Sequence, residues 1–152
     1  RRAARMERFR HVVLPLLPPD LRAEGKALLE RMAVVGEQAL CHGDLVTEHV
    51  LARDGRLSGV IDWGDVRVTD PALDLAWALN ATSAPFAETV AHGVGLDPER
   101  VARSRDWWAL APWSDVEHVV EHVVEHRGER EGADLRRAMG VLVDRILWWR
   151  QG

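Results

Sequence analysis

The chain has 152 residues, which is enough for one domain with a hydrophobic core but short for two. Its composition is that of a globular protein, with 47% hydrophobic and 29% charged residues. The net charge of −4 argues against the broad basic field that holds nucleic acid. The single cysteine, Cys41, excludes an internal disulfide, and no apolar run approaches the about 18 residues that span a bilayer. We therefore expect a cytoplasmic protein with neither nucleic-acid nor membrane partners.

The N-terminal part of the sequence predicts two helices. Residues 5–17 carry apolar side chains near the helical period of about 3.6 and are followed by two prolines. Asp20 is placed to cap a second helix, which runs to about Val35 and ends at Gly36. Because the sequence starts at Arg1 rather than at Met, we expect a fragment of a longer protein.

A β-hairpin is predicted in the middle of the chain. Residues 49–53 and 56–61 read as strands, and the Asp54-Gly55 pair between them is a strong signal for a two-residue turn. The remaining chain returns to helical patterns. The signals are an Asp-Pro pair at 70–71 with a helix through Leu79, a second Asp-Pro pair at 97–98, a Ser114/Glu117 capping box, and a last helix over residues 133–149. The expected fold is mainly α with one embedded β-hairpin (α+β).

The hairpin predicts that two aspartates converge. A two-residue turn pairs Arg53 with Arg56, and a regular ladder from that pair places Asp62 opposite Thr47. Asp44 lies three residues before Thr47, so both carboxylates reach the open end of the hairpin. There, one carboxylate can orient or deprotonate a hydroxyl while the other holds a divalent cation.

Four sequence blocks around this hairpin resemble the core signature of aminoglycoside phosphotransferases and their choline- and macrolide-kinase relatives. They are His42-Gly43-Asp44-Leu45, Val50-Leu51, Gly59-Val60-Ile61-Asp62-Trp63-Gly64-Asp65 and Asp70-Pro71-Ala72-Leu73-Asp74-Leu75-Ala76. The resemblance implies a single domain over residues 1–152 with the fold of a protein-kinase-like C-terminal lobe. It divides that lobe into leading helices (1–38), a catalytic loop, hairpin and metal-binding motif (39–69), and a helical acceptor-binding part (70–152).

The resemblance also implies roles for individual side chains. His42-Gly43-Asp44 stands where protein kinases carry H-R-D, so Asp44 is the expected catalytic residue that orients the acceptor hydroxyl or accepts its proton. Asp62 stands at the Asp of D-F-G and would bind Mg²⁺ that bridges the phosphates of ATP or GTP. Asp74 would brace the catalytic loop from its helix, and Asp65 would support the turn. The implied function is transfer of the γ-phosphate to a hydroxyl of an aminoglycoside-like, macrolide-like or related small molecule.

Two features depart from that pattern. His49 occupies the position of the kinase Asn that is the second metal ligand, although Mg²⁺ prefers oxygen donors. His49 is either a metal ligand, directly or through water, or a strand-edge residue, and Glu48 could supply an oxygen. In addition, no Gly-rich loop precedes His42, and Lys26, the one lysine, lies in a predicted helix. We therefore expect that the N-terminal nucleotide-binding lobe is absent from this sequence and that the fragment alone has little or no kinase activity.

Two other functions stay open from the sequence. The first is a non-catalytic remnant or binding module that keeps the fold and holds only a small molecule. The second is a zinc-binding hydrolase, because His118, His122 and His126 recur every four residues on one helix face. Valine pairs between these histidines favour an amphipathic helix with a solvated polar face instead.

Overall fold

The computed structural model describes residues 2–34, 36, 38–125 and 129–152. The chain divides into two compact units. Unit 1 comprises Arg1–Val34 and Ala109–Gly152, and unit 2 comprises Val35–Trp108. One long helix, α5 (Pro98–Glu125), contributes its first part to unit 2 and its second part to unit 1.

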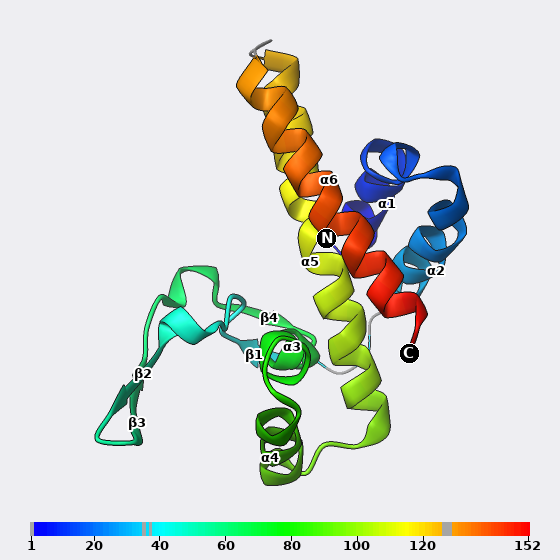
Figure 1. The fold of residues 1–152 in the computed structure, drawn as a ribbon. Helices are drawn as coiled ribbons and strands as arrows, with labels where there is room; N and C mark the ends of the chain where they lie inside the picture. Colours follow the sequence, from blue (N-terminus) through cyan, green and yellow to red (C-terminus); the bar gives the residue numbers. More distant parts are fainter. Residues whose placement is uncertain (1, 35, 37, 126–128) are drawn as a thin grey trace. The chain divides into compact units, whose positions relative to one another are not determined.

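Unit 1 is helical (Figure 1). Its elements are α1 (Arg2–Val12), short 3₁₀ turns at Leu14–Leu16 and Pro19–Leu21, α2 (Arg22–Ala33), the second part of α5, and α6 (Glu129–Arg150). Its core contains fully buried large side chains from all four helices, among them Phe9, Leu28, Leu29, Met32, Trp113, Val116, Leu142 and Ile146. The rings of Phe9 and Trp113 lie 5.9 Å apart, which joins α1 to α5.

The first two helices begin and end differently from the sequence prediction. α1 ends at Val12, short of the expected residue 17, because Pro15 has no N–H to continue the α-helical hydrogen bonds, and residues Leu14–Leu16 form a 3₁₀ turn instead. Asp20 does not cap α2. It lies within the second 3₁₀ turn, and Leu21 occupies the N-cap position without a side-chain capping bond.

The predicted capping box at Ser114 and Glu117 was also wrong. Both residues lie inside α5, which continues through Pro112. Ser114 Oγ instead accepts a hydrogen bond from Arg5 (2.7 Å), and the buried Glu117 carboxylate pairs with Arg8 (2.9 Å). Burial of the apolar face on both sides of the proline outweighs its local cost to the helix.

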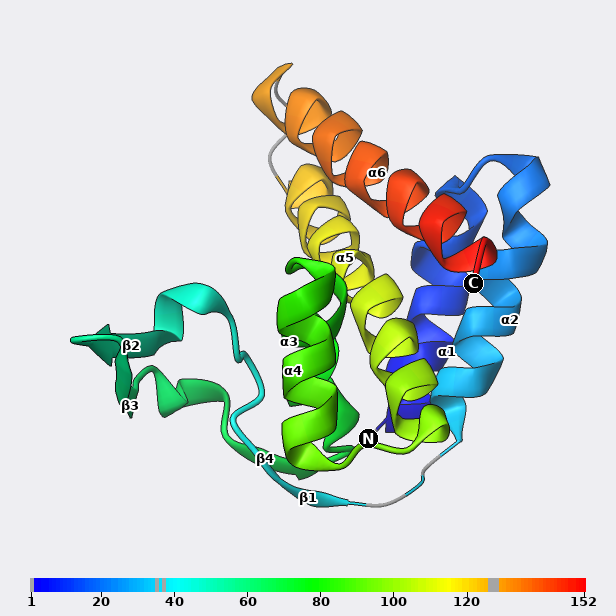
Figure 2. The same cartoon turned by 60° about the horizontal axis from the view of Figure 1, so that its bottom comes forward.

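The described residues of unit 2 form the antiparallel sheets β1–β4 and β2–β3 and the short helices α3 and α4 (Figure 2). Its elements are β1 (Ala39–Cys41), a 3₁₀ turn (Thr47–His49), β2 (Val50–Arg53), β3 (Arg56–Val60), a 3₁₀ turn (Trp63–Asp65), β4 (Arg67–Thr69), α3 (Ala72–Asn80), α4 (Ala84–Val94) and the first part of α5. The β2–β3 hairpin projects away from the α3–α4 pair in both views (Figures 1 and 2).

The predicted hairpin is present, but its register shifts. Arg53 pairs with Arg56 as expected, whereas beyond Ala52 a bulge moves the pairing by one residue, so that Leu51 faces Gly59. The ladder ends where the Ile61 N–H donates to the His49 carbonyl (2.9 Å). Asp62 is therefore not opposite Thr47, which lies in a 3₁₀ turn.

A second antiparallel sheet, β1–β4, was not predicted. Cys41 at the end of β1 faces Arg67 at the start of β4, and this pairing closes the chain segment that contains the hairpin. Immediately after β4, the Asp70 carboxylate accepts a hydrogen bond from the Ala72 N–H (3.0 Å). α3 begins at Ala72 with Pro71 at the N-cap position, one residue later than the Asp-Pro pair predicted. Arg103 on α5 donates to the other Asp70 oxygen (2.6 Å).

The expected fold class is confirmed: a mainly helical protein with small antiparallel strand pairs. Of the helices in the described ranges, none is both long and apolar enough to cross a membrane.

Candidate active site

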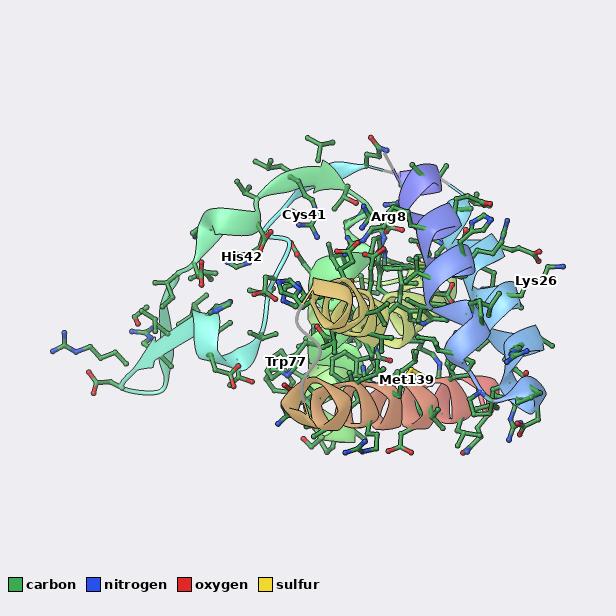
Figure 3. All side chains as sticks on the ribbon, turned by 90° about the horizontal axis from the view of Figure 1, so that it is seen from above. Arg8, Lys26, Cys41, His42, Trp77 and Met139 are labelled. Atoms are coloured by element: carbon green, nitrogen blue, oxygen red, sulfur yellow. The ribbon has the colours of Figure 1, made fainter. Side chains whose placement is uncertain are left out.

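The His42-Gly43-Asp44 loop leaves the end of β1, and the loop of residues 62–65 enters β4, its partner strand. His42 connects these two loops (Figure 3) and is almost fully buried. Its Nε2 lies 2.8 Å from the Ile61 carbonyl and its Nδ1 3.3 Å from the Asp44 N–H. Because a carbonyl only accepts, Nε2 carries the proton and Nδ1 is the acceptor. One neutral tautomer of His42 thus satisfies both loops.

Asp74 holds the same loop from α3. Its two carboxylate oxygens accept hydrogen bonds from the His42 N–H (2.7 Å) and the Gly43 N–H (2.9 Å). Charge-assisted bonds of this kind are about twice as strong as neutral ones. The bracing of the loop that was expected of Asp74 requires such backbone hydrogen bonds.

Gly43 has the positive φ of +91°. A Cβ at this position would overlap the Asp65 carbonyl oxygen and lie 2.9 Å from an Arg67 nitrogen. Only glycine fits this backbone conformation and this close approach. The glycine therefore permits the two loops to lie against each other.

Asp44, His49 and Asp62 come together beside these loops. His49 Nδ1 lies 3.9 Å from Asp44 Oδ2, and His49 Nε2 lies 3.4 Å from Asp62 Oδ2. The two aspartate side chains are 56% and 64% exposed, whereas the His49 side chain is only 16% exposed. The predicted convergence of the two carboxylates is thus present, and an imidazole ring lies between them.

The hydrogen bonds of His49 fix which of its nitrogens faces Asp62. Nδ1 lies 2.8 Å from the Asp44 backbone carbonyl, so it donates a proton there. In the neutral ring, Nε2 then has a free lone pair directed at the Asp62 carboxylate, which is also an acceptor. A positive group between these two atoms, either a proton or a metal cation, would satisfy both.

Asp62 adopts the left-handed conformation, with φ 62° and ψ 57°. A residue other than glycine pays about 1–3 kcal/mol to remain in such a region, and Asp tolerates it better than most. The conformation begins the 3₁₀ turn Trp63–Asp65, which leads the chain back into β4.

Two further side chains, Trp63 and Arg67, contact these loops, and sequence reasoning assigned no role to Arg67. The half-exposed Trp63 ring lies 4.8 Å from the His42 ring, and its Nε1 donates to the Val60 carbonyl (2.9 Å). Arg67 donates to the Gly43 carbonyl (3.3 Å) and to the Asp65 carbonyl (3.1 Å). The Asp65 carboxylate also lies near the Arg67 guanidinium (3.6 Å).

Cys41 precedes the His42-Gly43-Asp44 loop and is buried. Burial raises the pKa of its thiol above the ordinary value, and the negative charge of Asp74 raises it further. The thiol is therefore protonated at neutral pH and unreactive.

The donor atoms at Asp62 and His49 fit a divalent cation that also binds phosphates. Mg²⁺ takes one or two protein ligands and completes its shell with water and phosphate oxygens. Within the described ranges, no set of three or more His, Cys, Asp or Glu side chains could hold a metal ion by itself.

The histidines of the alternative zinc site lie in unit 1. His122 Nδ1 donates to the His118 carbonyl (2.8 Å), and the two exposed rings lie 4.0 Å apart. His126 lies outside the described residues. Lys26 is also in unit 1, on α2, where it points outward (Figure 3) and pairs with Glu30 (3.7 Å).

The fold is that of a kinase-like phosphotransferase. The chain belongs to the phosphotransferase enzyme family, whose family model matches residues 1–113.

A solved structure with a similar fold is that of macrolide 2'-phosphotransferase MphH from Brachybacterium faecium, as the apoenzyme, with a TM-score of 0.67 and 20% sequence identity. The match covers 93% of this chain and 48% of MphH, so the chain spans about half the length of that protein. Uncharacterized protein YcbJ of Bacillus subtilis (strain 168) is 45% identical over 40 residues, which are 26% of this chain and 13% of YcbJ.

Proposed function

We propose that this chain is the catalytic lobe of a small-molecule kinase, which transfers the γ-phosphate of a nucleoside triphosphate to an acceptor hydroxyl. The observation that carries the proposal is the convergence of Asp44, His49 and Asp62, with His49 Nε2 3.4 Å from Asp62 Oδ2. Membership of the phosphotransferase enzyme family supports the reaction class.

In this proposal Asp44 receives the acceptor. Its exposed carboxylate accepts a hydrogen bond from the acceptor hydroxyl and orients the oxygen toward the γ-phosphorus. The new O–P bond forms as the bond between the γ-phosphorus and the β–γ bridging oxygen breaks. The hydroxyl proton passes to the Asp44 carboxylate, and the nucleoside diphosphate leaves.

Asp62 would hold Mg²⁺, with His49 as a second ligand, either directly or through a water molecule. When bound, the cation would neutralise charge on the phosphate oxygens. The residues around it keep both ligands in place: the Asp44 carbonyl orients the His49 ring, and His42 holds the carbonyl of the residue before Asp62.

The acceptor is proposed at the level of a class. MphH, which shares the fold, is a macrolide 2'-phosphotransferase, and this favours a hydroxyl of a macrolide or an aminoglycoside-like compound. The exposed indole of Trp63 beside the site could contact the apolar surface of such a molecule.

The test is a radiolabelled phosphate-transfer assay with ATP and GTP against a panel of macrolides and aminoglycosides. It compares these 152 residues with the longest reading frame that contains them. We expect turnover from the longer protein and little from the 152 residues, because Lys26 is paired with Glu30 on α2 and the sequence has no other lysine to contact the phosphates.

Two active-site variants and one control sharpen the result. Asp44→Asn and Asp62→Asn should each abolish turnover in the longer protein, whereas Glu88→Gln on the exposed side of α4 should not. Acceptor binding without turnover, unchanged in both aspartate variants, would instead support a non-catalytic binding module.

A further inference from the structure

Arg67 lies where the two loops of the site meet. It is the first residue of β4 and pairs with Cys41, the last residue of β1. The His42-Gly43-Asp44 loop follows Cys41 directly, and the turn Trp63–Asp65 lies just before Arg67. Strand pairing therefore places this arginine beside both loops.

The guanidinium contacts one backbone carbonyl from each loop. Nη2 donates to the Gly43 carbonyl (3.3 Å), and Nη1 donates to the Asp65 carbonyl (3.1 Å). The same Nη1 lies 3.6 Å from the Asp65 carboxylate. The missing side chain at Gly43 makes room for this arrangement, because a Cβ there would lie 2.9 Å from Nη1.

The two bonds come from the two terminal nitrogens of one planar, forked donor. Arg presents several N–H groups in fixed directions, whereas a Lys ammonium on a flexible stem is a point charge. The geometry thus favours a role that depends on the shape of the guanidinium as well as on its charge.

We propose that Arg67 is a positioning residue, which fixes the loop of Asp44 against the loop of Asp62. The distance between the acceptor at Asp44 and the cation at Asp62 would thereby be set. The roles of acceptor and cation rest on the proposed function. Arg67 would act through the backbone of the two loops, since its guanidinium donates to one carbonyl of each.

Electrostatics alone predicts the opposite effect on cation binding. A positive charge beside the aspartates repels a divalent cation, so its removal should strengthen binding. If Arg67 positions the ligands, its removal should weaken binding instead. The sign of the change in affinity therefore separates the two roles.

The experiment uses the 152-residue chain with Mn²⁺ as the probe. Two variants are compared: Arg67→Met removes the charge and the donors, and Arg67→Lys keeps the charge but loses the fork. Arg53→Met on β2 is the matched control, since its side chain is 86% exposed and pairs with the neighbouring Asp54. Mn²⁺ affinity is measured from the electron paramagnetic resonance signal of the free ion, and thermal unfolding is recorded for each variant.

A second readout does not depend on the metal. Hydrogen exchange of the His42 and Gly43 amides, which donate to Asp74, reports the order of the loop. We expect exchange to be about tenfold faster and Mn²⁺ binding several-fold weaker in both Arg67 variants, with the control unchanged.

Tighter Mn²⁺ binding in Arg67→Met with wild-type behaviour in Arg67→Lys would overturn the proposal, as would unchanged exchange in both variants. The Asp62→Asn variant shows whether the proposed function itself fails. If wild type and Asp62→Asn bind Mn²⁺ equally, or neither binds it, the cation site is wrong, and the exchange rates still decide the role of Arg67.

Discussion

Removal of the Asp74 carboxylate should destabilise the loop that carries Asp44. Asp74 accepts two backbone hydrogen bonds, of 2.7 and 2.9 Å, from His42 and Gly43. A hydrogen bond to a charged group contributes about 1.5–3 kcal/mol, and an unpaired buried donor adds a further cost. Since Asp74 is half-buried, the lower end of that range applies to each bond, and Asp74→Ala should cost about 3 kcal/mol in the free energy of unfolding.

Asp74→Asn should cost about half as much. The amide oxygen keeps one acceptor for one N–H, while its NH₂ group faces the other N–H as a second donor. The ratio between the two variants therefore tests whether both bonds contribute, because a purely steric role for Asp74 would leave Asn close to wild type.

Urea unfolding measures these differences, with the change in midpoint at constant slope taken as the change in stability. Glu88→Gln, on the exposed side of α4, is the control for loss of one negative charge and should lie within about 0.5 kcal/mol of wild type. An Asp74→Ala variant as stable as this control would refute the bracing role derived from the two bonds.

Three further predictions follow from single contacts. Gly43→Ala should destabilise the chain by more than about 2 kcal/mol, since the φ of +91° and the Asp65 carbonyl leave no room for a methyl group. Gly140→Ala in α6, where a Cβ meets open space, should instead stabilise the chain by about 0.5–1 kcal/mol. Chemical denaturation of both variants measures the two changes in the free energy of unfolding. The Cys41 thiol should react with Ellman's reagent much more slowly in the folded than in the urea-unfolded chain, and equal rates in both states would contradict its burial. Because folding raises the pKa of this thiol, its contribution to stability is complete below the ordinary thiol pKa. That contribution is lost as the pH rises through the raised pKa. His49→Asn should shift the metal preference from Mn²⁺ toward Mg²⁺, measured as the ratio of the two dissociation constants, and the nitrogen coupling in the spectrum of bound Mn²⁺ should disappear.

The hairpin turn could be predicted from sequence because its cause is local. Asp54 and Gly55 both adopt positive φ, of 50° and 71°, as the turn favoured by that pair requires. The register beyond the turn could not. Every residue of β2 is exposed, so no alternation of buried and exposed side chains selects one register. For the same reason, the bulge between Leu51 and Ala52 could not be predicted from the order of apolar and polar residues.

The contacts of Arg67 could not be predicted, for a different reason. β1 and β4 have three residues each, and residues 42–66 separate them along the chain. A strand of three residues carries too little periodicity to be recognised, and its partner is set by tertiary structure. The resemblance located the loops that carry Asp44 and Asp62, whereas the contacts of Arg67 with both loops are visible only in the folded structure.

His49 can make the contacts that the Asn of kinases would make at the same position. The role that the geometry requires is one donor toward the Asp44 carbonyl and one acceptor toward Asp62. An Asn side chain meets it with its NH₂ group and its carbonyl oxygen, and the imidazole meets it with the Nδ1 proton and the Nε2 lone pair. The exchange keeps the hydrogen-bond pattern and replaces an oxygen donor to the cation with a nitrogen donor. Metal preference, rather than the loss of the site, is therefore the property that this substitution should change.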